Sequence, residues 1–135
     1  MRKSLVAAAG IAALLAACST APAEQARSPQ AAKELADALA GRVAGPPQRC
    51  ISTYRNTKVQ PIDDFTILYD QGSTIYVQNP RGGCPGVSNG GDVLVTRQVT
   101  NQICDGEIAQ TVDLTSRVSR GGCVFGPFVP YTKPR

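Results

Sequence analysis

The hydrophobic and polar positions of this 135-residue chain divide it into three regions. An apolar run, broken only by Gly10, extends from Leu5 to Ala17. A mostly polar stretch follows, in which apolar residues recur at helical spacing as far as Val43. From Arg49 onward, apolar and polar positions alternate with a period of two, as in strands that bury one face. The pattern predicts an apolar leader, a linker with a short helix, and a β domain.

Seven segments of the third region are rich in strand-forming residues. They cover residues 49–55, 58–62, 65–69, 74–79, 92–99, 108–112 and 123–131. Pro61 has no N–H to donate, which restricts the second segment to a sheet edge. The turn residues 70–73, Asp-Gln-Gly-Ser, predict that the segments on either side pair antiparallel. We expect one all-β domain over residues 48–135, built as a small antiparallel barrel or sandwich.

The linker, residues 18–47, combines a flexible tether with one helix. Ser28 is a good N-cap and Pro29 suits the first helical position. Leu35, Leu39 and Val43 form a narrow apolar stripe, and Gly45-Pro46-Pro47 ends the pattern. A helix of about 14 residues is marginal alone in water. Two interpretations remain: the helix frays or rests on the domain, or it binds a partner.

The leader has the features of an export signal. Arg2 and Lys3 precede an apolar run of 13 residues, too short for a bilayer that needs roughly 20. The motif Leu15-Ala16-Ala17-Cys18 resembles a bacterial lipobox, which predicts a signal peptide over residues 1–17 and a lipid on Cys18. Ser19, in place of the aspartate of the familiar inner-membrane retention signal, favours the periplasmic face of the outer membrane. Cleavage at Ala21-Pro22-Ala23 without lipidation is the alternative.

Charge and composition exclude several functions. Without Arg2 and Lys3 the chain keeps 12 basic and 10 acidic side chains, with no basic cluster, so we expect no nucleic-acid partner. The absence of histidine removes the usual catalytic base and a common zinc ligand. We therefore expect no enzyme activity, no cofactor and no metal.

Four cysteines follow Cys18, an even number in an oxidising compartment, and predict two disulfides. Cys50 opens the first strand segment and Cys123 opens the last. We favour Cys50–Cys123 with Cys84–Cys104, because a bridge between the domain's ends closes the longer loop. The pairing Cys50–Cys84 with Cys104–Cys123 ranks second.

Two carboxylate pairs are the candidate binding positions. Asp63 and Asp64 are expected in a turn, where Asp bonds its own backbone. Asp105 and Glu107 are expected on one face of a strand, but two ligands fall short of the oxygens that calcium needs. Convergence of the two pairs in a cleft would favour hydrolysis by paired carboxylates.

Several short motifs occur in a characteristic order: RCI, IDDFTILY, GGCPG, ICDGEI and CVFGPFVPY. Together with the four cysteines, they resemble a family of small proteobacterial proteins, the domain of unknown function 6491, over about residues 49–131. The resemblance implies an all-β fold and no known activity.

Two functions remain open. The first is a non-catalytic, lipid-anchored module that binds or braces an envelope protein or glycan. The second is a small carboxylate-dependent envelope enzyme acting on cell-wall or lipid material.

Overall fold

The computed structural model describes residues 27–54 and 56–135. The predicted signal peptide and lipidation site, Cys18, lie outside the described residues. Within the described part, no helix has the length and apolar character needed to cross a membrane.

Helix α1 spans Pro29–Ala38 and begins as the sequence predicts. The Ser28 hydroxyl oxygen accepts a hydrogen bond from the Ala31 N–H at 3.2 Å. The helix is shorter than expected, because Gly41 adopts a left-handed conformation and redirects the chain into β1, Val43–Ala44. Val43 therefore belongs to a strand and is 59% exposed, which corrects its assignment to the helical stripe.

Five antiparallel strands form the middle layer. In sheet order they are β1, β10 (Phe128–Thr132), β5 (Thr74–Gln78), β4 (Thr66–Asp70) and β3 (Lys58–Asp63). The predicted hairpin around residues 70–73 is confirmed as β4–β5. Pro61 lies in β3, an edge strand, as its missing N–H requires.

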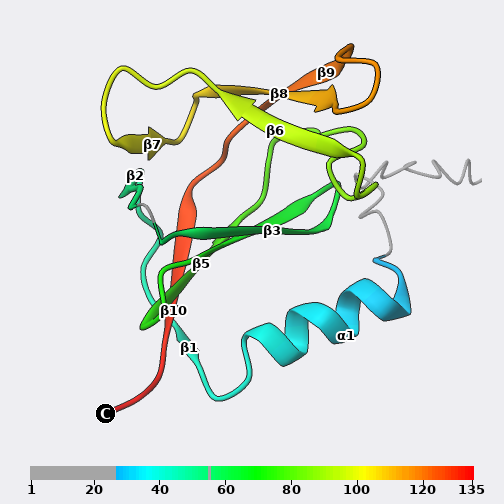
Figure 1. The fold of residues 1–135 in the computed structure, drawn as a ribbon. Helices are drawn as coiled ribbons and strands as arrows, with labels where there is room; N and C mark the ends of the chain where they lie inside the picture. The colour runs from blue at the N-terminus through cyan, green and yellow to red at the C-terminus, as the bar shows by residue number, and fades with distance from the viewer. Residues whose placement is uncertain (1–26, 55) are drawn as a thin grey trace, which may run out of the picture.

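Two smaller sheets form the layer above (Figure 1). The larger has the order β6 (Asp92–Thr96), β8 (Ile108–Asp113) and β9 (Ser119–Val124), and the smaller pairs β2 (Cys50–Ser52) with β7 (Gln102–Cys104). All pairings are antiparallel and the sheets stay open, so the all-β prediction is confirmed in its sandwich form.

Residues 123–131, expected as one extended segment, contribute to both layers. The segment ends β9 at Val124 and starts β10 at Phe128. Between them, Gly126 passes so close to Asn79 that an added Cβ would lie 2.7 Å from the Asn79 carbonyl oxygen. The chain therefore crosses from one layer to the other at a glycine.

Two cores hold the layers together. Helix α1 packs on one face of the middle sheet through Ala31, against Leu68 and Val77, which confirms the interpretation that it rests on the domain. On the other face, Tyr69, Phe125 and Phe128 meet edge to face, with ring centroids 5.7–6.5 Å apart.

The structure contains two disulfides, but neither pairing proposed from the sequence is correct. Cys50 bonds Cys104, its direct partner in the β2–β7 ladder. Cys84 bonds Cys123, because its loop runs alongside β9, where Arg81 bridges Val124. The disulfide pairs are decided by which segments, distant in sequence, lie side by side. The length of the closed loop, used to rank the pairings from the sequence, gave the wrong order.

Candidate functional site

An apolar groove of about 320 Å³ lies between β3 and β6. In Figure 1, β6 of the upper layer lies above β3 of the middle layer. The groove is lined by Val59, Pro61, Tyr69, Val87, Asp92, Val93, Leu94, Thr96 and Ile103. Its size is at the lower end of the range of small-ligand sites, which are also mainly apolar.

The floor of the groove is buried and its rim is exposed. Tyr69, Val87 and Ile103 are 2–4% exposed and belong to the core between the layers. Val59 on β3 and Val93 on β6 are 48% and 36% exposed. Burial raises the pKa of the Tyr69 hydroxyl well above its usual value, so this group stays neutral and can act as a hydrogen-bond partner. The groove therefore has mainly apolar walls, with Thr96 and Asp92 as its other polar residues.

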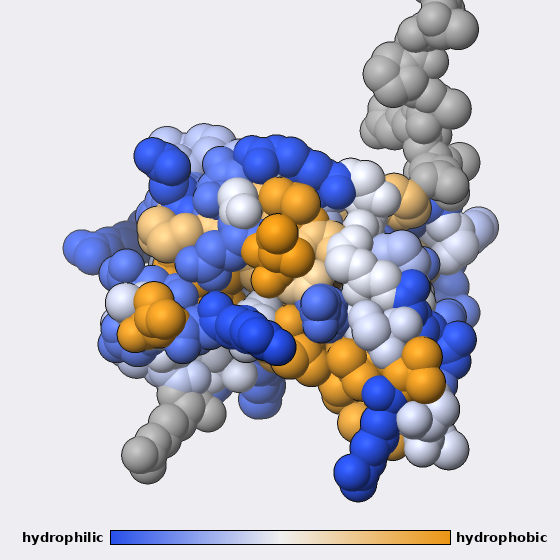
Figure 2. Space-filling view, turned by 90° about the horizontal axis from the view of Figure 1, so that it is seen from above, coloured by the Kyte–Doolittle hydropathy of each residue, from blue (hydrophilic) through white to orange (hydrophobic). Residues whose placement is uncertain are grey.

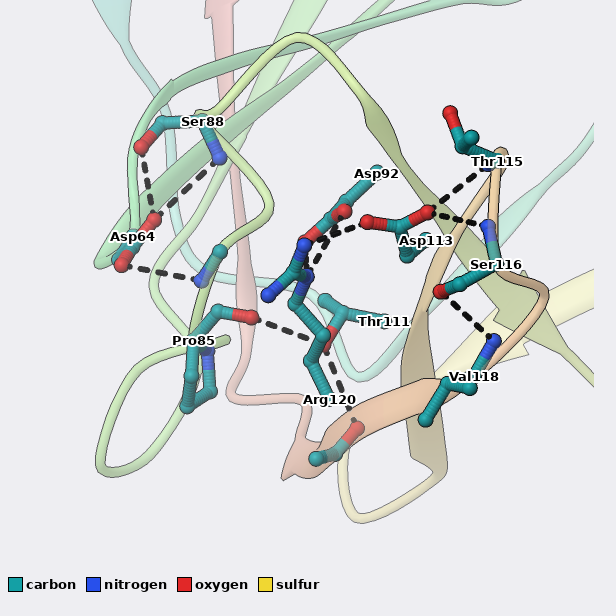
Figure 3. Close-up of polar contacts among 12 residues, drawn as sticks. Asp64, Pro85, Ser88, Asp92, Thr111, Asp113, Thr115, Ser116, Val118 and Arg120 are labelled. Carbon is teal, nitrogen blue, oxygen red and sulfur yellow. Dashed lines mark hydrogen bonds and ion pairs between the residues drawn. The ribbon is translucent and has the colours of Figure 1, made fainter.

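A charged cluster closes the groove at Asp92. The Asp92 side chain is 2% exposed, and Arg120 Nε lies 3.0 Å from its Oδ2 and 3.1 Å from its Oδ1. Only the contact to Oδ1 has hydrogen-bond geometry, so within the described residues Oδ2 is buried without a donor. Figure 3 shows Arg120 between Asp92 and Asp113, and its Nη2 also bonds Asp113.

The β8–β9 pairing places this arginine. The register shifts between Thr111 and Val112, so Arg120 has no direct partner across the ladder and lies in a bulge. Asp92 and Asp113 are direct partners in the β6–β8 ladder, where two like charges would repel. Arg120 resolves the repulsion by bonding both carboxylates.

The pKa of Asp113 is lower than usual. The backbone N–H of Ser116, and then the Arg120 guanidinium, lower the pKa of Asp113 from 3.8 to about 2. Because the folded state favours the ionised carboxyl, Asp113 stabilises the fold. This contribution is complete above the pKa of Asp113 in the unfolded chain and is lost as the pH falls through its pKa in the folded protein. We expect the Asp113→Asn variant to lose less stability than the parent chain between about pH 4 and about pH 2. Unfolding midpoints at several pH values measure this; identical slopes would contradict it.

Asp63 ends β3 and Asp64 follows it in the predicted turn between β3 and β4, and each makes a different structural contact. Asp63 Oδ1 accepts the Phe65 N–H at 2.8 Å, and its Oδ2 pairs with Arg27 Nε at 2.6 Å. Asp64 accepts hydrogen bonds from the Gly86 N–H and from both the N–H and hydroxyl of Ser88 (Figure 3). These contacts hold the start of α1 and the glycine-rich loop.

Asp105 and Glu107 do not share a strand face, which corrects the prediction. They flank Gly106 in the turn between β7 and β8, and Gly106 has a positive φ of 90° that suits glycine. Asp105 pairs with Arg81 at 2.5 Å. The Glu107 carbonyl accepts the Phe125 N–H.

The two acidic pairs do not converge. The β3–β4 turn and the β7–β8 turn lie apart in Figure 1, and each contacts a different end of the segment 81–84: Arg81 pairs with Asp105, and the Cys84 N–H donates to the Asp64 carbonyl. Within the described residues no hydrogen bond joins one acidic pair to the other. Residues 27–54 and 56–135 contain no group of three or more acidic, histidine or cysteine side chains that could hold a metal ion.

A second hollow, of about 780 Å³, lies at the C-terminal end and is open and basic. Its charged residues are Arg42, Lys133 and Arg135. Arg42 already donates to the carbonyls of Gly72 and Ser73 in the β4–β5 turn. The smaller groove is the better site, because its walls are apolar and its floor is buried.

The sequence analysis did not identify Asp92 and Arg120. Asp92 could have been noted, as a carboxylate opening the apolar strand Asp-Val-Leu-Val-Thr. Arg120 gives no such signal, because its position depends on a bulge in the pairing of β8 with β9.

Comparison with known proteins gives one match. The model of a family of unknown function, DUF6491, matches residues 1–124. The chain belongs to this family. The match includes the leader and linker, beyond the 49–131 expected from the motifs, and ends with β9. No curated protein matches the chain, and no solved structure matches it. Membership of the DUF6491 family does not indicate a function, so the function has to be argued from the site.

Proposed function

We propose that this DUF6491 protein is a lipid-anchored lipoprotein at the periplasmic face of the outer membrane. Its folded domain is a non-catalytic module that binds another envelope component. The anchor is the lipid on Cys18, whose acyl chains hold a protein on a bilayer by about 0.8 kcal/mol per buried CH₂. The residues between Cys18 and α1 lift the domain from the surface.

The apolar groove between β3 and β6 is the observation that supports binding. It combines a buried floor with exposed valines on both rims, as in sites for apolar ligand segments. The four carboxylates on which an enzyme was considered are separate, and Asp63, Asp64 and Asp105 each hold a loop or an arginine. Apolar walls with one carboxylate at the end suit an apolar segment of an envelope protein.

The anchor is tested by changing Cys18. Cys18→Ser removes the thiol that carries the lipid, and we expect the protein to move from the membrane fraction to the soluble fraction. Ser19→Asp keeps the thiol and is expected to shift the protein from the outer to the inner membrane. Fractionation of cells and the mass of the N-terminal peptide measure both. A Cys18→Ser variant that stays on the membrane contradicts the anchor.

The groove is tested by photo-crosslinking in intact cells. A photo-reactive amino acid replaces Val59 on the groove rim, and the matched control replaces Val43 on the opposite edge strand of the same sheet. Both valines are about half exposed, at 48% and 59%. We expect an adduct with one envelope protein from position 59 and none above background from position 43. Equal labelling from the two positions contradicts binding at the groove.

A further inference from the structure

Strand β6 has an unprotected edge. It is the outer strand of its sheet, and within residues 27–54 and 56–135 its outer edge makes no backbone hydrogen bond. A strand of this kind, apolar and without proline or lysine, is a template for pairing with another chain. Its three central residues, Val93 to Val95, fit that description, and its one charged residue, Asp92, lies at the end of the strand and is paired with Arg120.

The other sheet edges carry protection. Strand β3 contains Pro61 and a bulge next to it, and begins with Lys58. Strand β9 is covered where the Arg81 N–H donates to the Val124 carbonyl. Strand β1 has only two residues, and β2 and β7 have three each. The exposed edge of β6 is thus an exception within this fold.

The residues of β6 are complementary to themselves. In an antiparallel pair of two β6 strands centred on Leu94, Val93 of each copy lies opposite Val95 of the other. Asp92 then lies opposite Thr96, so no charge faces a like charge. This register uses all five residues of the strand. A register centred one residue away pairs fewer of them.

We propose that two copies of this chain pair through their β6 edges, antiparallel and centred on Leu94, to form one continuous six-stranded sheet. The two-fold axis passes between the Leu94 residues of the two copies, perpendicular to the sheet. The binding grooves lie beneath β6 in each copy, so they open onto one another across this axis. The second copy therefore completes the site, with residues from both chains.

The surface around β6 supports this occupant. The outward-facing residues of the sheet include Val93 and Val95 on β6 and Ile108 on β8, which are 36%, 43% and 67% exposed. Figure 2, seen from above, shows an apolar patch on this face, bordered by hydrophilic residues. Pairing brings the valines of the two copies together, so the side of the apolar patch that faces the other copy is removed from water.

The combined site rests on the proposed binding function, and the sufficiency of a short interface rests on the proposed anchor. Anchoring on one membrane raises the effective concentration of the two copies, so a short interface suffices for association.

Register-specific disulfide formation tests the pairing. Full-length chains with two different tags carry Val93→Cys and Val95→Cys, and envelopes are oxidised with copper phenanthroline. Directly opposite Cα atoms lie about 4.5–5.5 Å apart, within disulfide range, whereas diagonal neighbours lie about 7–8 Å apart. We expect about fivefold or more mixed dimer relative to either variant with itself. The control is Gln110→Cys, exposed on the central strand β8 of the same sheet.

Charge exchange tests the same register without a covalent bond. Val93→Lys/Val95→Lys places lysine opposite lysine, and Val93→Glu/Val95→Glu places glutamate opposite glutamate. Each variant is expected not to co-isolate with itself, and the two are expected to co-isolate with each other. Intact native disulfides confirm that the variants fold. Mixed dimer at the level of the Gln110→Cys control, or co-isolation unchanged by charge, overturns the pairing. Either result leaves membrane attachment and capture at Val59 unaffected, so it is distinct from failure of the proposed function.

Discussion

Replacing Cys84 and Cys123 together with alanine is expected to lower the free energy of unfolding by about 4 kcal/mol. The bridge joins residues 39 apart, and the chain-entropy model gives this magnitude for a loop of that length. The melting temperature is expected to fall by roughly 15–25 °C. Both sulfurs lie in the core between the layers, where the residues are 0% and 3% exposed.

The matched comparison is Cys50→Ala/Cys104→Ala. That bridge closes a longer loop of 54 residues, but it joins half-buried residues of a short two-stranded sheet. Loop entropy alone predicts an equal or slightly larger loss for it. A larger loss for Cys84→Ala/Cys123→Ala would measure the added contribution of core packing. A loss below about 1 kcal/mol for that variant would contradict a structural role.

Phe128→Ala is expected to lower the free energy of unfolding by about 3–5 kcal/mol. Phe128 is fully buried, and its ring centroid lies 5.7 Å from that of Tyr69 and 6.2 Å from that of Phe125. Removing it leaves a cavity at the junction of the two layers, and both neighbouring rings lose an edge-to-face partner. Urea unfolding followed by circular dichroism measures the loss.

Tyr54→Ala is the control for Phe128→Ala. Tyr54 is 60% exposed, so its truncation is expected to change stability by no more than about 0.5 kcal/mol. Similar losses for the two variants would show that the aromatic cluster does not join the layers. Because Tyr69 also forms the groove floor, Phe128→Ala is further expected to reduce crosslinking from Val59.

Local pattern was sufficient for much of the fold. The alternation of polar and apolar residues identified the strands around residues 70–73 and their hairpin. The fixed φ and missing N–H of Pro61 placed β3 at an edge, and the Ser28–Pro29 pair started the helix. Each of these features depends on residues close in sequence, so the sequence by itself determined them.

Long-range register was decided only by the tertiary structure. The disulfide pairs follow from β2 lying beside β7 and from the loop of Cys84 lying beside β9, neither of which period-two alternation can specify. Asp105 and Glu107 separated because Gly106 makes a turn where a strand was expected. The groove is made by two edge strands from different sheets, and Arg120 enters its charged end through a bulge. The sequence alone thus determined the start of the helix, the β4–β5 hairpin and the edge position of β3, whereas β1, β7 and the first residues of β9 were not among the predicted strands. The anchor stays a prediction. Packing between the layers decided the site, because its side chains come from segments that no local pattern connects.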